Sequence, residues 1–180
     1  MKYKVIDNFL DEEYFNFLEI LFTERGLEKE GNPLMPWCLN TNIVSGTGIK
    51  KPASKIDKLF YMTHMLYAGN TPQSPFYEKL VPLLEKLKAR CLIRIKANLY
   101  PNTEILHEHS MHTDYDFSHS AAILSLNTCN GYTKLKDSTK IDSVANRVLL
   151  FDASEEHCST TTTNIPARIN ININYIQEQL

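Results

Sequence analysis

The second half of the chain is a succession of short segments with β-strand character, and this feature limits most strongly what the sequence can fold into. Turn-forming residues separate five runs that are rich in β-branched and other apolar residues: residues 91–100, 120–127, 131–136, 146–153 and 167–175. No helical segment lies between these runs. A series of strands without intervening helices predicts a sandwich or a barrel, so we expect this half to close on itself.

The first half of the chain begins with a short strand at residues 3–6 and continues into a segment with helical periodicity. Asp11 can cap this helix, because its carboxylate can accept a hydrogen bond from a free backbone N–H of the first turn, and Gly26 can end it. The apolar residues of the segment fall at helical spacing: Tyr14, Phe15, Leu18, Leu21 and Phe22. We therefore expect a helix that packs one face against the rest of the fold.

A second helical pattern covers residues 74–90, with Ser74 as its cap and Pro75 in its first turn. Pro82 either kinks this helix or begins another short one. The preceding segment, residues 59–69, is apolar enough for a buried strand or a short helix, and periodicity does not decide between them.

Residues 31–55 are dense in Gly, Pro, Ser and Asn around Trp37, which predicts a long ordered loop or lid. The length of 180 residues, with 43% hydrophobic and 22% charged residues, fits one domain. We therefore expect an α+β fold in a single domain over residues 1–180. In this interpretation residues 1–90 form a helical support and lid region, and residues 91–180 form the core strands.

The charge of the chain argues against a nucleic-acid partner, because the formal net charge is -2 and no run rich in Lys or Arg occurs. The N-terminus lacks the apolar core of a signal peptide, and no apolar run is long enough to span a bilayer. We expect a soluble, cytoplasmic protein without a membrane partner, whose four scattered cysteines are reduced thiols.

Four of the six histidines crowd into the stretch HEHSMHTDYDFSH, which spans residues 107–119. Within it, His112 and Asp114 are two residues apart, so on a strand both side chains would point to one face and could bind one ion. A third ligand would have to come from elsewhere, and His64 and His157 are the two histidines outside the cluster. Two histidines and one carboxylate form the facial triad that holds Fe(II) and leaves the opposite coordination positions open.

The last predicted strand has two unlike faces. Isoleucines at positions 169, 171 and 173 alternate with Arg168 and with asparagines at positions 170, 172 and 174. Asparagine is a poor strand former, so this polar face needs a reason. The first core strand repeats the pattern, because Arg94, Lys96, Asn98 and Tyr100 alternate with apolar residues. Either these faces line a polar interior, or the last strand is an edge strand that presents polar groups to water.

Arg168 follows His157 by 11 positions, and with this spacing the sequence resembles the Fe(II)/2-oxoglutarate-dependent dioxygenase superfamily. Within the superfamily it resembles the small prolyl 4-hydroxylase-like members, which include short phage and bacterial forms. His112, Asp114 and His157 match the metal ligands of that family, and Arg168 matches the residue that binds the distal carboxylate of 2-oxoglutarate. The stretches VIDNFLDEEYFNFL, LYPNTEILHEHSMHTDYD and NRVLLFDASEEH also resemble family segments. Residues 30–75 match nothing in it.

The resemblance implies a double-stranded β-helix, or jelly-roll, core with N-terminal helices packed on one sheet. It implies an enzyme that uses Fe(II), 2-oxoglutarate and O2 to hydroxylate an aliphatic C–H bond, as prolyl hydroxylases do, with release of succinate and CO2. Arg168, Tyr100, Asn98 and Asn170 are then the residues that bind the cosubstrate. The primary substrate is an unknown peptide or small molecule, and we expect a monomer or a weak homodimer.

Two other interpretations of the histidine cluster stay open at this point. A catalytically silent, metal-binding jelly-roll protein that acts as a sensor or scaffold would be favoured if Arg168 were exposed to solvent. A cupin-like enzyme would hold its metal through His107 and His109 and would need no oxoglutarate. In the oxygenase interpretation these two histidines lie at the surface or support the ligands, His119 could orient a ligand, and His64 is a buried, hydrogen-bonded side chain.

Overall fold

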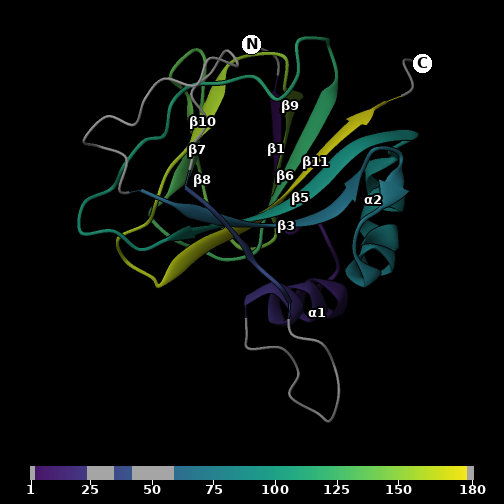
Figure 1. The fold of residues 1–180 in the computed structure, drawn as a ribbon, viewed down its shortest axis with the longest axis horizontal. Coiled ribbons are helices and arrows are strands. Elements are labelled where there is room, and N and C mark those ends of the chain that lie inside the picture. The colour runs from purple at the N-terminus through teal and green to yellow at the C-terminus, as the bar shows by residue number, and fades with distance from the viewer. Residues whose placement is uncertain (1–2, 24–34, 42–58, 178–180) are drawn as a thin grey trace.

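The computed structural model describes residues 3–23, 35–41 and 59–177, and its elements follow one another as drawn in Figure 1. In chain order they are β1 (Tyr3–Ile6), α1 (Glu12–Thr23), β2 (Cys38–Asn40), β3 (Tyr61–Ala68), β4 (Thr71–Pro72), the 3-10 helix η1 (Pro75–Leu80), α2 (Val81–Leu87), β5 (Cys91–Pro101), β6 (Ser120–Ser125), β7 (Tyr132–Leu135), β8 (Lys140–Asp142), β9 (Arg147–Asp152), β10 (His157–Ser159) and β11 (Ala167–Ile176).

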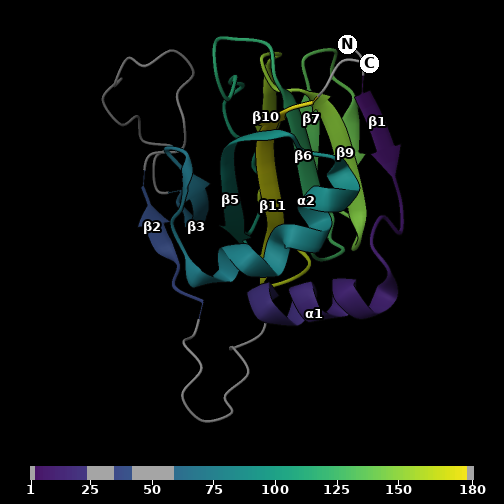
Figure 2. The ribbon, with the colours of Figure 1, turned by 90° about the vertical axis from the view of Figure 1, so that its right-hand side faces the viewer.

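The described strands form two sheets, and neighbouring strands are paired antiparallel. The large sheet has the order β1-β9-β6-β11-β5-β3-β2, with β4 paired to β3, and the small sheet has the order β10-β7-β8. Helices α1 and α2 cover one face of the large sheet, and the small sheet lies on the other side (Figures 1 and 2). This arrangement confirms the predicted α+β fold with a jelly-roll core and N-terminal helices on one sheet.

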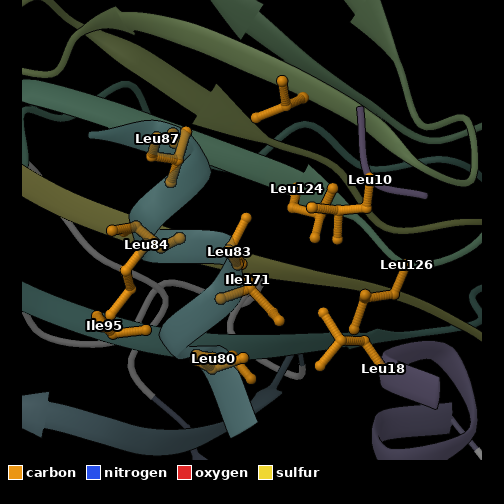
Figure 3. Close-up of a cluster of buried hydrophobic side chains, with 14 of the residues drawn as sticks. Leu10, Leu18, Leu80, Leu83, Leu84, Leu87, Ile95, Leu124, Leu126 and Ile171 are labelled. Atoms are coloured by element: carbon orange, nitrogen blue, oxygen red, sulfur yellow. The ribbon is translucent and has the colours of Figure 1, made fainter. Parts of the chain in front are cut away.

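Two apolar cores hold these layers together. The larger one lies between the helices and the large sheet, where Leu18 of α1 and Leu83 of α2 pack with Ile171 of β11 (Figure 3). The smaller one lies between the two sheets and joins Ile123 of β6 with Leu135 of β7. Because successive strand residues point to opposite faces, one strand such as β6 supplies side chains to both cores.

Strand β11 lies in the interior of the large sheet, paired with β5 on one side and β6 on the other. The alternative that this strand is an edge strand is therefore wrong. Its isoleucines at positions 169, 171 and 173 belong to the core under the helices, where each buried side chain contributes roughly 1.5–3 kcal/mol. Its polar residues face the other way and are at most 7% exposed: Arg168, Asn170, Asn172 and Asn174.

The first half of the chain supplies strands to the sheet as well as helices. Residues 59–69, for which strand and helix were both open, contain the strand β3, which pairs with β5. The short strands β2, β8 and β10 were not predicted, because three residues are too few to show a period of two. The loop predicted over residues 31–55 is therefore wrong at Cys38–Asn40, where β2 pairs with β3. The assignment of residues 1–180 to one domain stays a prediction.

The two predicted helix caps, Asp11 and Ser74, are confirmed. The Asp11 carboxylate accepts a hydrogen bond from the Tyr14 N–H at 2.9 Å, and the Ser74 hydroxyl accepts one from Phe76 at 3.2 Å. Pro82 is the second residue of a separate short helix, α2, so it lies at the start of a new helix and does not kink a continuous one. Gly26 and most of the loop predicted over residues 31–55 lie outside the described residues. None of the helices within the described ranges is long and apolar enough to cross a membrane.

Asn146 ties the N-terminal segment to the turn before β9. Its side chain accepts a hydrogen bond from the Leu10 N–H at 2.8 Å and donates one to the Leu10 carbonyl at 2.9 Å. Its backbone carbonyl accepts a third bond, from the Phe9 N–H at 2.9 Å. The residue is 8% exposed and has a left-handed φ of 60°, which asparagine tolerates better than most residues.

We predict that Asn146→Ala lowers the free energy of unfolding by about 1–3 kcal/mol, because the substitution leaves the Leu10 backbone groups without partners in a buried site. Urea denaturation followed by circular dichroism measures the change. Asn70→Ala is the matched control, because Asn70 also has a φ of 60° but is exposed. An equal loss in both variants would show that the backbone conformation, and not the buried hydrogen bonds, sets the cost.

Candidate active site

His112, Asp114 and His157 form the one group of metal-binding side chains found in the part of the chain that the structure describes, with their ligand atoms within 4.8 Å of one another. Backbone pairing brings them together. The His112 N–H donates to the His157 carbonyl at 2.9 Å, and the His157 N–H donates to the His112 carbonyl at 2.9 Å. The segment that carries His112 is thus held antiparallel to β10, and the Asp114 N–H is fixed by the Ala153 carbonyl at 3.1 Å.

Both histidine rings are oriented by backbone carbonyls. Nδ1 of His112 lies 3.2 Å from the Ser110 carbonyl, and Nδ1 of His157 lies 3.0 Å from the Glu155 carbonyl. A carbonyl oxygen can only accept, so the proton is assigned to Nδ1 and the lone pair to Nε2. Burial lowers the pKa of His112, and burial together with the neighbouring His112 lowers the pKa of His157 to about 4. Both rings are therefore neutral at pH 7, which is the form that binds a metal.

The Asp114 carboxylate is held by three donors. Arg94 Nη2 donates to Oδ1 at 2.7 Å, and the side-chain amides of Asn172 and Asn174 donate to Oδ2 at 3.1 and 2.8 Å. Burial raises the pKa of this carboxyl, but Arg94, His157 and the two amides outweigh it and keep the pKa below its usual range. A carboxylate has about four lone-pair directions, so one remains for an ion.

His119 and Asn174 extend this support by one more step. Nδ1 of His119 lies 2.8 Å from the Phe117 carbonyl, and its Nε2 lies 3.3 Å from the Asn174 amide that binds Asp114. His119 therefore positions Asn174, and Asn174 in turn holds the Asp114 carboxylate. The sequence pattern placed Arg94 and Asn174 on polar strand faces but did not connect them to Asp114, because that contact depends on how the loop after β5 returns over the sheet.

A cavity next to this cluster is lined by predicted and unpredicted residues. Asn98, Tyr100 and Asn170, predicted to bind a cosubstrate, all lie on its wall. Strands β5 and β11 bring them together, because Asn98 is paired with Asn170 in the ladder and Tyr100 with Arg168. Asn98 donates to the Asn170 side chain at 2.9 Å. The wall also includes Asn172, which the polar face of the last predicted strand already offered as a lining residue. Sequence reasoning did not select the other residues of the wall: Tyr61, Lys96, His109, Ser110, Ile123 and Ser159.

Arg168 is 1% exposed and contacts the cavity wall without being part of its lining. Its guanidinium carbon lies 5.4 Å from the centre of the Tyr100 ring, Nη2 donates to the Thr133 hydroxyl at 3.0 Å, and Nη1 donates to the Thr160 carbonyl at 3.4 Å. Its Nε is buried without a partner, and no carboxylate of the described residues pairs with the group. A buried cation without a counter-ion is costly, so this arrangement favours an anionic ligand.

Gly131 leaves the space that the Arg168 side chain occupies. A Cβ atom at position 131 would lie 2.7 Å from Cδ of Arg168 and 2.6 Å from the Thr161 carbonyl oxygen. Both distances are shorter than the contacts that a carbon atom makes in well-packed proteins, so a larger residue would displace the arginine or its neighbours.

The other histidines take separate places. His109 lies on the cavity wall with its ring 5.3 Å from that of Tyr100, and burial lowers its pKa to about 4. Neither His107 nor His109 belongs to the described metal-binding group, so the arrangement does not support the cupin interpretation. His64 is buried, with Nδ1 at 2.7 Å from the Pro36 carbonyl and Nε2 at 2.7 Å from the Ser74 hydroxyl, as predicted for a structural histidine.

No family model matches the chain, and no curated protein does so. Solved structures match it over nearly its whole length. A prolyl-4-hydroxylase from Pseudomonas putida has a TM-score of 0.59 and 16% identity, over 98% of this chain and 92% of that one. A 2OG-Fe(II) oxygenase family protein from Burkholderia pseudomallei has a TM-score of 0.63 and 12% identity, over 98% and 86%.

A third structure is the viral collagen prolyl hydroxylase of Paramecium Bursaria Chlorella virus-1 in complex with 2OG. It has a TM-score of 0.55 and 13% identity, over 99% of this chain and 97% of that one. At such low identity these matches establish the fold. The chain has the jelly-roll fold of the prolyl-4-hydroxylase-like 2OG-Fe(II) oxygenases, as the spacing of its histidines, aspartate and arginine predicted.

Proposed function

We propose that the protein is an Fe(II)- and 2-oxoglutarate-dependent dioxygenase that hydroxylates an aliphatic C–H bond, in the manner of prolyl hydroxylases, with release of succinate and CO2. One observation carries the proposal. A three-residue metal-binding group and a buried guanidinium without a counter-ion flank the same polar cavity. A metal site alone would fit many proteins, but a second site for an anion fits a cosubstrate with two carboxylates.

The donor set fits the proposed ion. Two neutral imidazole nitrogens and one carboxylate oxygen suit Fe(II), and three protein ligands leave coordination positions for small molecules. When bound, Fe(II) would supply the activation of O2 that no amino-acid side chain can provide. The protein's own contribution is to hold the ligands, to bind the cosubstrate and to keep bulk water from the reacting groups.

The second anchor of the cosubstrate would be Arg168. Its planar guanidinium can bind a carboxylate through two parallel hydrogen bonds, which the point charge of a lysine cannot do. Thr133 fixes one end of the guanidinium, and Tyr100 packs against its face. Burial raises the pKa of Tyr100 to about 12, so its hydroxyl stays neutral and can donate to a bound anion.

The metal ligands are tested by His112→Ala, which we predict to weaken divalent-ion binding by at least about 100-fold, since two protein ligands do not hold the ion as three do. Anaerobic calorimetric titration with Fe(II) measures the affinity. His107→Ala is the control and should keep the wild-type affinity. The opposite result, with His107→Ala losing the metal and His112→Ala retaining it, would support the cupin interpretation.

The cosubstrate anchor is tested by Arg168→Met, which we predict to weaken 2-oxoglutarate binding by about 10- to 100-fold, the value of one or two charge-assisted hydrogen bonds. Titration of 2-oxoglutarate into the Mn(II)-loaded protein measures this without turnover. The affinity for Mn(II) itself should not change. Unaltered 2-oxoglutarate binding would show that Arg168 is not the anchor of the cosubstrate.

The packing around Arg168 is tested by Gly131→Ala. We predict a loss of at least about 10-fold in 2-oxoglutarate affinity with unchanged metal affinity, because the new methyl group displaces the guanidinium. Gly69→Ala is the matched control: it has no atom within 4 Å of its Cβ position but a φ of +57°, so it should cost stability without changing the affinity. Wild-type affinity in Gly131→Ala would show that the anchor does not depend on this contact.

A further inference from the structure

Lys96 places a cation on the wall of the cavity, between the metal-binding group and the residues proposed to bind the cosubstrate. It lies on β5 two residues from Arg94 and two residues from Asn98, on the same strand face. Across the ladder it is paired with Asn172, whose amide binds Asp114. The side chain lines the cavity, so a ligand in the cavity can reach it.

This ammonium group has no hydrogen-bond or ion-pair partner among the described residues. It lies over the face of the Tyr61 ring, 5.7 Å from the ring centre. Asp114, the acidic residue of the cavity wall, is already bound by Arg94 and two asparagine amides. Burial and the nearby Arg94 lower the pKa of Lys96 to about 8, so the amine is still mostly protonated at pH 7. A partly buried cation is thus kept without a compensating anion.

The proposed cosubstrate does not supply that anion. Arg94, Lys96 and Arg168 are positive and Asp114 is negative, so positive charges exceed negative ones by two in this part of the described structure. A divalent ion would add two positive charges and 2-oxoglutarate would cancel two. One end of the cosubstrate would bind the metal and the other Arg168. Lys96 would still lack a partner, which leaves room for a second anionic ligand.

We propose that the primary substrate carries a carboxylate group that pairs with Lys96. The inference rests on the proposed function and deepens it by naming a chemical class of substrate. Lys96 is then a specificity residue that holds one end of the substrate beside the metal-binding group. The carboxylate can belong to a free amino acid or to an acidic side chain in a peptide, and both sources offer the same charge to the same amine.

The test uses the Zn(II)-loaded protein with 2-oxoglutarate, which cannot turn over, and ligand-observed NMR to find which small molecules bind. The probes are the free amino acids, the same compounds as carboxamides, and N-acetylated aspartate and glutamate amides. We expect at least one carboxylate-bearing compound to bind about 10-fold more tightly than its uncharged counterpart, as a charge-assisted hydrogen bond predicts. Binding of the blocked acidic residues alone would assign the carboxylate to a peptide side chain.

Two variants locate the effect. Lys96→Met should lower the affinity for the carboxylate compound to that for its uncharged counterpart and leave the affinity for 2-oxoglutarate unchanged. Lys4→Met, at an exposed lysine on β1, should change neither affinity. The inference is overturned if no carboxylate compound binds or if the uncharged form binds equally well. It is also overturned if Lys96→Met lowers the affinity for 2-oxoglutarate instead of the affinity for the carboxylate compound. Failure of 2-oxoglutarate to bind the wild-type protein would contradict the proposed function itself, so the two failures are distinguishable.

Discussion

Strand β11 alternates between apolar and polar residues, and this alternation determines both how the core packs and where the candidate site lies. Because its isoleucines point toward the helices and its arginine and asparagines point the other way, one strand anchors the largest core and lines the candidate site. Its central position, between β5 and β6, removes both polar and apolar side chains from water. A shift of one residue in register would exchange the two faces, so the packing of the isoleucines also fixes the position of the site.

Burying so many polar groups is costly, and the structure offsets the cost by bonding them to one another. Asn172 and Asn174 bind Asp114, and Asn98 binds Asn170. The buried polar atoms that stay without a partner among the described residues gather in and around the cavity: Arg94 Nε, Asn98 Oδ1, His109 Nε2, Arg168 Nε and Asn172 Oδ1. Such a concentration is typical of a binding site whose ligand completes the hydrogen bonds.

The fold and the centre of the site could be predicted because their signals are local. Alternation within β5 and β11 is visible in single segments, and His112, Asp114 and His157 stand out with Arg168 at a familiar spacing. The roles of Arg94, His109 and Lys96 could not be predicted, because they follow from the register between β5 and β11 and from the path of the loop over them. The three-residue strand β10 was missed for a simpler reason, since it is too short to show a period.

In the proposed function, one cavity binds a metal through three side chains and a 2-oxoglutarate molecule beside it. Anaerobic titration of the metal-free protein with Fe(II) and 2-oxoglutarate, followed by visible absorption, tests it most directly. A bidentate 2-oxoglutarate chelate of Fe(II) gives a weak charge-transfer band, and the account predicts that this band appears only when both are present. Absence of the band in properly folded protein would contradict the oxygenase assignment and leave a jelly-roll protein with a different function.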